Sequence, residues 1–188
     1  MGVLDEGERL TAADAAAWRA WLEDNHERAA GVWLLSVRGT TADGLGYEDA
    51  VRQALCFGWI DGPVRTFDGV NAQWFSPRRP GSGWAATNKA RLIELEAAGL
   101  LAPAGIRVLE TAKANGSWTL LDGPEAGIEP PELTAALDAM PAARTNWDAF
   151  PKSVKKFGLT HIAMAKRAET RDVRVAKIVA DAAEGKRP

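Results

Sequence analysis

Two strand-like segments on either side of Asp68-Gly69 constrain the fold of this chain more than any other feature. The segments cover residues 59–68 and 70–77, and the dipeptide between them readily takes the positive φ angles of a tight turn. We therefore predict a β-hairpin. Pro63 has no N–H to donate to a neighbouring strand, so it should lie at a sheet edge or a bulge, where the adjacent glycines let the backbone bend.

Helical and strand patterns alternate along the rest of the chain. We predict helices at residues 14–26 (with Thr11 or Asp14 as the cap), 47–57, 84–98, 103–115, 152–166 and 170–184, and a strand at 31–38 that ends in the turn-rich GTTADGLG. The expected fold class is α+β: a small antiparallel sheet with the hairpin, packed by helices, followed by an all-helical C-terminal part. We place an α+β domain at residues 1–116, a linker loop rich in Gly, Asp and Pro at 117–130, and the helical region at 131–188.

Composition narrows the class of protein further. A chain of 188 residues with 46% hydrophobic content can bury one sizeable core. We expect a cytoplasmic protein without membrane insertion, because no apolar run approaches roughly 20 residues and the acidic start lacks a secretory signal. A single cysteine, Cys56, and two histidines, His26 and His161, form no spaced ligand set. We predict no metal and no cofactor, and a buried structural role for Cys56.

The stretch from Ala54 to Asn88 gathers tryptophan, arginine, aspartate and glycine in an order that no ordinary core requires. Arg78 and Arg79 offer forked donors for carboxylate or phosphate, and Ser82 is expected just before a helix start, where free N–H groups favour anions. The hypothesis is a small anionic ligand, and the candidate binding residues are Trp59, Asp61, Arg65, Trp74, Arg78, Arg79, Ser82, Trp84 and Asn88. The alternative is that the arginines pair with Asp61 and Asp68 and that the tryptophans fill the core.

Two other functions stay open. An enzyme of unknown reaction would use Asp61 as a proton-handling group near Arg65, although no catalytic partner for it is evident and no nucleotide fingerprint is present. Residues 151–188 carry ten Lys and Arg and four Asp and Glu, so their last helices are a candidate nucleic-acid surface. A basic helix alone does not predict this, because Val173, Ile178 and Val179 read as core contacts.

Four motifs together resemble a known family. They are ALCFGWIDG, FSPRRPGSGW followed by Asn88, the PAG helix start at Pro103, and AKRAETR near the end of the chain. In this order and at these separations they resemble the YdeI/OmpD-associated family, over nearly the whole chain. Ala168 departs from the proline that the family pattern has there, which would alter a helix start and not a pocket.

The resemblance implies an α+β N-terminal part, a helical C-terminal part, and a bacterial protein of the bacteriocin-protection and stress-tolerance type. It implies no defined catalytic mechanism and names no protein partner. The leading hypothesis is therefore a cytosolic protection or regulatory protein, not an enzyme, that binds a small anionic ligand through the hairpin and the Arg78-Arg79 loop.

Overall fold

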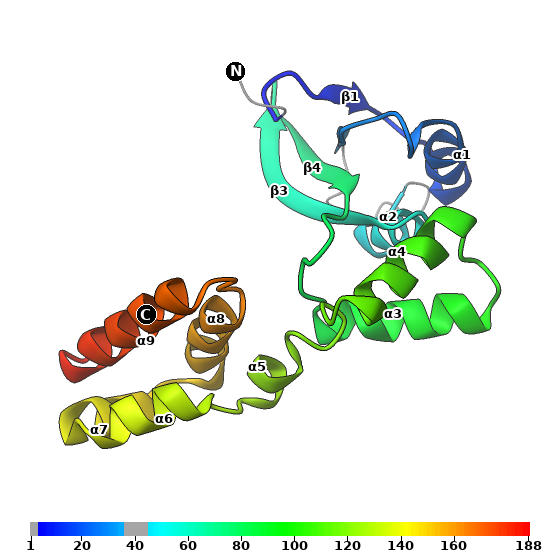
Figure 1. Cartoon of the computed structure of the whole chain (residues 1–188). Coiled ribbons are helices and arrows are strands. Elements are labelled where there is room, and N and C mark those ends of the chain that lie inside the picture. Colours follow the sequence, from blue (N-terminus) through cyan, green and yellow to red (C-terminus); the bar gives the residue numbers. More distant parts are fainter. Residues whose placement is uncertain (1–3, 36–44) are drawn as a thin grey trace. The chain divides into compact units, whose positions relative to one another are not determined.

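The computed structural model describes residues 4–35 and 45–188, which group into two compact units (Figure 1). Unit 1 comprises Met1–Ser82 and Thr87–Asn115, and unit 2 comprises Gly83–Ala86 and Gly116–Pro188. Residues 117–130, expected as a linker, thus group with the C-terminal helices. The domain limits 1–116, 117–130 and 131–188 stay a prediction. A domain is a unit that can fold by itself, and close internal contacts alone do not show that a unit does so.

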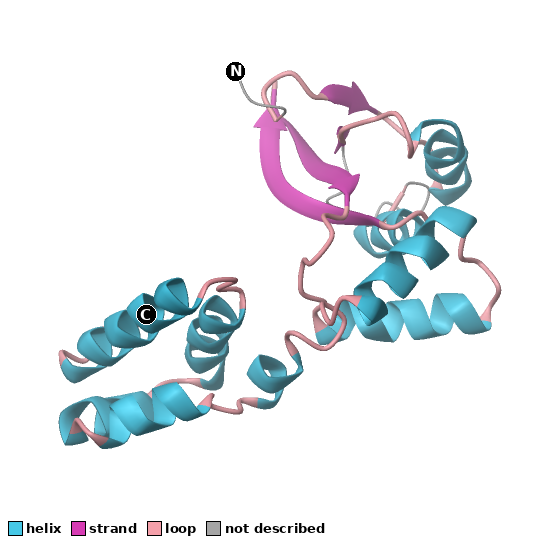
Figure 2. Ribbon diagram, viewed as in Figure 1, coloured by secondary structure: helices cyan, strands magenta, loops and turns pink. Residues whose placement is uncertain are grey.

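Unit 1 is built on a four-stranded sheet with the order β1-β2-β4-β3 (Figure 2). Its strands are β1 (Glu8–Leu10), β2 (Val32–Leu35), β3 (Trp59–Phe67) and β4 (Val70–Pro77). β1 runs parallel to β2, whereas the other neighbours are antiparallel. The α+β class is confirmed, but the sheet is mixed and not purely antiparallel. The three residues of β1 are too few to show an alternating pattern, so the sequence does not reveal that strand.

β3 and β4 form the predicted hairpin. Asp68 and Gly69 have φ angles of 51° and 83° and occupy the two turn positions. Asp68 is the only non-glycine residue with a positive φ among those described. An aspartate tolerates that conformation better than most side chains do, so the local dipeptide fixes the turn and with it the pairing of the two strands.

A bulge interrupts β3 where the sequence places Pro63. The register passes from Asp61 opposite Phe75 to Val64 opposite Gln73, so β3 carries one extra residue there. The buried Gln73 side chain donates from Nε2 to the Gly62 carbonyl at 2.6 Å, which satisfies a carbonyl that the ladder leaves without a partner. The predicted irregularity is confirmed.

Four helices accompany the sheet: α1 (Ala15–Asn25), α2 (Tyr47–Cys56), α3 (Ala86–Ala97) and α4 (Pro103–Ala114). Asp14 caps α1 by accepting the Ala17 N–H at 2.8 Å, as its position predicts. α2 packs against α1, β3 and α4. Of the turn predicted at residues 39–46, residues 39–44 lie outside the described part of the chain.

Aromatic side chains bury both faces of the sheet. Trp18 of α1 packs against Phe75 with ring centroids 5.4 Å apart, on the face that the helices cover. Trp33 packs against Trp74 at 5.1 Å on the opposite face, because successive side chains of a strand alternate between faces. Trp33 also donates its Nε1–H to the Leu4 carbonyl at 2.9 Å, so the N-terminal segment covers this second face.

Unit 2 is helical, and its helices are α5 (Asp122–Ala126), α6 (Pro131–Asp138), α7 (Pro141–Ala149), α8 (Lys152–Ala163) and α9 (Ala168–Ala183). Pro131 and Pro141 open α6 and α7, where the fixed φ angle of proline suits the first turn of a helix. α9 packs against α6, α7 and α8 (Figure 1). Trp147 is fully buried in the core of this unit. The short α5 lies in the segment that the sequence suggested was a loop.

One predicted core contact is wrong. Val173 is 68% exposed, whereas Ile178 and Val179 are buried as expected. The buried residues of α9 begin at Val175, and a side chain two positions earlier on a helix points to a different side. Val173 therefore lies on the outer surface of unit 2.

Candidate functional site

The three tryptophans of the predicted site are buried. Trp59 is 1% exposed and donates its Nε1–H to the His26 carbonyl at 3.2 Å. Trp74 lies in the sheet core of unit 1, and Trp84 lies in unit 2, where its ring centroid is 5.4 Å from that of Trp118. Their rings contact protein atoms, which matches the alternative that they fill the cores. Stacking on a ligand stays a prediction.

Asp61 and Arg65 have different partners. The Tyr47 hydroxyl donates to Asp61 Oδ2 at 2.7 Å, while Arg65 pairs with Asp5 at 2.9 Å. The bulge is the reason, since residues 61 and 65 would share a face in a regular strand but the extra residue turns them to opposite faces. The guanidinium of Arg65 therefore lies over the ring of Trp33, on the face that Asp61 does not share.

Arg78 and Arg79 follow β4 directly. The Arg78 backbone N–H donates to the Gly58 carbonyl at 3.0 Å, which holds this residue at the open end of the hairpin. Burial lowers the pKa of Arg78 to about 10, and the charge of nearby Asp61 opposes that lowering. Arg78 thus stays charged at neutral pH. Arg79 is exposed.

Ser82 does not precede the helix start as predicted. Helix α3 begins at Ala86, and the Ser82 backbone N–H instead donates to the Arg79 carbonyl at 3.1 Å in a turn. Trp84, which lies between Ser82 and the start of α3, is 2% exposed. The first N–H of α3, that of Ala86, donates to Glu125 Oε1 at 3.3 Å, so a carboxylate already lies at this helix start.

Asn88 is held by an arginine that the sequence did not single out. Arg91 Nη1 donates to Asn88 Oδ1 at 2.7 Å, and its Nε and Nη2 donate to Glu48 at 2.9 and 2.6 Å. This forked contact joins α3 to the start of α2. A second pair between the same helices, Arg52 to Glu94 at 2.8 Å, strengthens the connection.

Together these contacts define a polar cluster at the open end of the hairpin, which we call the hairpin-base cluster. Its members are Tyr47, Glu48, Asp61, Arg78, Asn88 and Arg91. Burial and the hydrogen bond to Asp61 raise the pKa of Tyr47 to about 12, so its hydroxyl stays protonated near neutral pH. The contact with Arg91 lowers the pKa of Glu48, which therefore stays ionised.

Three predicted site residues, Asp61, Arg78 and Asn88, thus come together in the hairpin-base cluster. Sequence reasoning missed Tyr47, Glu48 and Arg91. Arg91 could have been predicted from the sequence, because it follows Asn88 by three positions on one helix and residues at that spacing are neighbours. Tyr47 and Glu48 gave no signal, since only the packing of α2 on β3 brings them to the hairpin.

Cys56 is a buried thiol at the end of α2. Burial raises the pKa of its thiol, although the nearby Arg19 acts in the opposite direction. A raised pKa keeps the thiol protonated and a poor nucleophile. This agrees with the structural role predicted for it.

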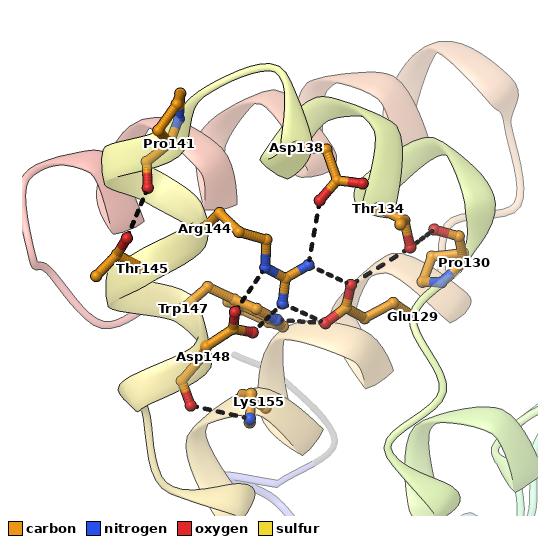
Figure 3. Close-up of polar contacts among 10 residues, drawn as sticks. All are labelled: Glu129, Pro130, Thr134, Asp138, Pro141, Arg144, Thr145, Trp147, Asp148 and Lys155. Carbon is orange, nitrogen blue, oxygen red and sulfur yellow. Dashed lines mark hydrogen bonds and ion pairs between the residues drawn. The ribbon is translucent and has the colours of Figure 1, made fainter.

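Unit 2 contains a second polar network, centred on Glu129 (Figure 3). Both carboxylate oxygens accept from Arg144 at 2.8 Å, and Oε1 also accepts the Trp147 Nε1–H at 2.8 Å. Arg144 pairs in addition with Asp148 and lies 3.9 Å from Asp138. The network ties α7 to the segment that precedes α6, above the core of unit 2.

We expect this network to make unit 2 sensitive to acid. The hydrogen bonds from Arg144 and Trp147 lower the pKa of Glu129 from 4.5 to about 2. A carboxylate with a lowered folded-state pKa contributes stability above pH 4.5 and loses it as the pH falls toward 2, here on the order of 3 kcal/mol. Hydrogen exchange of α9 amides between pH 5 and pH 2 measures the loss.

The Glu129→Gln variant is the test of that assignment. It should be less stable than the wild type at pH 7 and lose less stability on acidification, because it has no carboxylate to protonate there. Asp138→Asn, which changes an exposed carboxylate 3.9 Å from Arg144, is the matched control and should cost little at pH 7. An equally steep pH dependence in Glu129→Gln and wild type would contradict the assignment.

Within residues 4–35 and 45–188, no helix has both the length and the apolar composition needed to cross a membrane. The same part of the chain has no group of three or more His, Cys, Asp or Glu side chains that could hold a metal ion.

Comparison with known families divides the chain much as its fold does, into an α+β unit and a helical unit. Residues 10–108 match the model described as a domain of unknown function (DUF8412), and residues 127–185 match the one described as "Bacteriocin-protection, YdeI or OmpD-Associated". The chain therefore belongs to the family of that domain of unknown function, and its C-terminal helices match the YdeI/OmpD-associated family. No curated protein and no solved structure matches the chain significantly.

The family expected from the sequence is confirmed, but its expected extent is not. Of the four motifs that carried the resemblance, only AKRAETR lies within residues 127–185. The other three lie within residues 10–108, which match the other family model. The hairpin and its arginines are thus features of the domain of unknown function.

Proposed function

We propose that this chain acts in bacteriocin protection and that unit 1 contributes by binding a small anionic ligand at the hairpin-base cluster. The match of residues 127–185 to the YdeI/OmpD-associated family supports the first part of the proposal, because the family description names bacteriocin protection. The second part concerns the two arginines that follow β4. Arg78 would anchor the anion with its guanidinium group, and the exposed Arg79 would close over it.

The observation that carries the binding proposal is the position of Arg78 within the cluster. Its guanidinium is partly withdrawn from water and close to Asp61, while the guanidinium of Arg91 lies in the same cluster. Charge-assisted hydrogen bonds to a carboxylate or phosphate are stronger where water is partly excluded. Asp61 is itself held by the Tyr47 hydroxyl, so the cluster is ordered before any ligand arrives.

Tyr47 favours binding over acid-base catalysis as the role of this cluster. A hydroxyl whose pKa is about 12 is a poor base at neutral pH, and here it donates its proton to Asp61. Asp61 therefore already accepts a hydrogen bond on one of its two carboxylate oxygens, Oδ2. This arrangement suits a carboxylate that orients its neighbours.

We expect the full chain to bind small anions with an affinity that depends on both arginines. Inorganic phosphate and a panel of small carboxylates and phosphates would be titrated in thermal-shift and calorimetric experiments, since a ligand of the native state raises its apparent stability. Arg79→Ala should weaken binding of the tightest probe about tenfold, because one charged hydrogen bond is lost. Arg78→Lys keeps the charge, loses the fork, and should weaken binding as well.

Arg107→Ala is the matched control for those variants. Arg107 is 61% exposed and its guanidinium pairs with Glu27 at 3.3 Å, away from the hairpin-base cluster. Its loss should leave every affinity unchanged. If no probe binds the wild type, or if Arg79→Ala and Arg78→Lys bind as tightly as it does, the ligand site is not here. Bacteriocin survival of cells producing each variant then tests the protection role separately.

A further inference from the structure

The hairpin-base cluster contains as many acidic as basic side chains. Among its members, Glu48 and Asp61 are acidic, whereas Arg78 and Arg91 are basic. A ligand with only an anionic group would therefore meet two carboxylates close to the arginines that attract it. Like charges repel one another more strongly where water is partly excluded. The charge balance of the cluster thus bears on which class of anion the site accepts.

The two carboxylates of the cluster differ in how many donors they already have. Glu48 accepts from Nε and Nη2 of Arg91 at 2.9 and 2.6 Å, and it lies 3.8 Å from Arg52. Asp61 accepts from the Tyr47 hydroxyl on Oδ2, and no other side chain of the described residues donates a hydrogen bond to it. An ionised carboxylate can accept about four hydrogen bonds. Asp61 can therefore still accept a donor from a ligand on Oδ1.

Tyr47 provides an aromatic surface beside this carboxylate. Its side chain is 40% exposed, and its hydroxyl oxygen lies 2.7 Å from Oδ2 of Asp61. Aromatic rings attract cations electrostatically, and a carboxylate forms charge-assisted hydrogen bonds with an ammonium group. Tyr47 and Asp61 together thus have the chemistry of a small cation subsite next to the arginines.

The bulge in β3 fixes the position of Asp61. Gln73, which is 7% exposed, donates from Nε2 to the carbonyl of Gly62 at 2.6 Å and to that of Pro63 at 3.4 Å. A Cβ atom on Gly62 would lie 2.9 Å from Cδ1 of Trp74, so the backbone that follows Asp61 packs closely against the sheet core. A carboxylate on a backbone held in this way needs little reordering to bind a ligand.

Building on the anion site proposed for Arg78 and Arg79, we propose that its ligand is a small zwitterion, whose ammonium group binds Asp61 beside the ring of Tyr47. The ammonium group donates to Oδ1 and offsets the repulsion between Asp61 and the anionic group of the ligand. An anion without an ammonium group lacks this compensation. Small amino acids and aminoalkyl phosphates belong to this class of ligand, whereas inorganic phosphate and dicarboxylates do not.

Two series of probes, each varied at a single group, would test the ligand class on the full chain. The carboxylates are propionate, its β-hydroxy derivative and β-alanine, and the phosphates are ethyl phosphate, glycol phosphate and phosphoethanolamine. Calorimetric titration at pH 8 compares them in the fully ionised state of both anionic groups. We expect the ammonium member of each series to bind about tenfold more tightly than the alkyl member, because it gains one charge-assisted hydrogen bond.

Tyr47 gives a readout at the subsite itself, because it is the only tyrosine of the chain. Tyrosine isotope-labelled at the ring carbon that bears the hydroxyl therefore gives a single NMR signal. Since this hydroxyl donates to Asp61, the signal should shift when an ammonium group binds the same carboxylate. Saturation with β-alanine or phosphoethanolamine should move it further than saturation with propionate or ethyl phosphate.

Asp61→Asn removes the charge that the ammonium group would bind but keeps an acceptor for the Tyr47 hydroxyl. This variant should bind the ammonium probes about tenfold more weakly than the wild type and the alkyl probes more tightly, so the preference is lost. Asp68→Asn is the matched control, because Asp68 is a carboxylate at the turn of the same hairpin with a side chain that is 95% exposed. Asparagine also tolerates its φ of 51°, and this variant should keep the wild-type preference.

Equal affinity for the ammonium and alkyl probes would overturn the zwitterion proposal and leave the anion site standing. A preference that Asp61→Asn retains, or tighter binding of the hydroxyl probes than of the ammonium probes, would overturn it in the same way. If no probe binds the wild type, the anion site itself is wrong, and the zwitterion proposal fails with it.

Discussion

Replacing Trp147 by alanine should lower the free energy of unfolding of unit 2 by about 3–5 kcal/mol, the usual cost of truncating a large buried aromatic. Trp147 is fully buried at the centre of the helical core, and its ring lies beside Phe150 with centroids 6.3 Å apart. The variant also loses the hydrogen bond from Nε1 to Glu129. Hydrogen exchange of α9 amides in the full chain reports this loss without interference from unit 1.

Trp147→Phe separates the two contributions. It retains most of the buried ring but removes the N–H that Glu129 accepts, so it should cost about 2 kcal/mol, the scale of a hydrogen bond to a charged group. In the Glu129→Gln background, Trp147→Ala should lower the free energy of unfolding by less than it does in the wild type. The hydrogen bond from Nε1 that it removes would then have a neutral acceptor and not a carboxylate. A cost below about 1 kcal/mol for Trp147→Ala would show that this ring does not hold unit 2 together.

The second large effect should come from Gly105→Ala in the PAG motif. A Cβ atom at this position would lie 2.2 Å from the carbonyl oxygen of Cys56 and 3.2 Å from that of Leu55. These are backbone atoms at the end of α2 and cannot rotate away. We expect unit 1 to lose about 3 kcal/mol of unfolding free energy, even though alanine is favoured over glycine within a helix by about 1 kcal/mol.

The Gly105→Ala change should also weaken a hydrogen bond between the segment before α4 and the end of α2. The Ala102 N–H donates to the Cys56 carbonyl at 3.0 Å, so moving α4 outward to admit a methyl group lengthens this bond. Urea unfolding followed by hydrogen exchange of β4 amides measures the cost. Glu110→Ala, an exposed change on the same helix, should alter stability by less than about 0.5 kcal/mol. A wild-type stability for Gly105→Ala would mean that the two helices pack less closely than described.

The sequence predicts those parts of the fold that a few adjacent residues determine. Asp68-Gly69 determines the hairpin turn, Pro63 marks the bulge, Asp14 caps its helix, and prolines open α6 and α7. In each case the physical cause is a φ angle, a missing N–H or a side-chain acceptor within three residues. Such features need no knowledge of the rest of the chain.

The hairpin-base cluster could be only partly predicted, because it depends on contacts between distant segments. Asp61 and Arg78 stand out in the sequence, yet the partner of Asp61 is Tyr47, which reaches it only after α2 packs on β3. Arg65 could not be placed either, since one extra residue in the bulge decides which face it occupies. Val173 was predicted to lie in the core and is exposed. Its position also depends on contacts between distant segments, because they decide how α9 is rotated against the rest of unit 2.

The two outer strands of the sheet have a bearing on how the chain behaves at high concentration. Among the described strands, β1 and β3 form the edges; β1 has three residues, and β3 carries Pro63, a bulge and the charged Arg65. A short or irregular edge presents few aligned N–H and C=O groups to another chain. The hairpin irregularity that positions Asp61 thus also makes this edge a poor template for intermolecular β-pairing, and unit 1 should resist aggregation through its sheet.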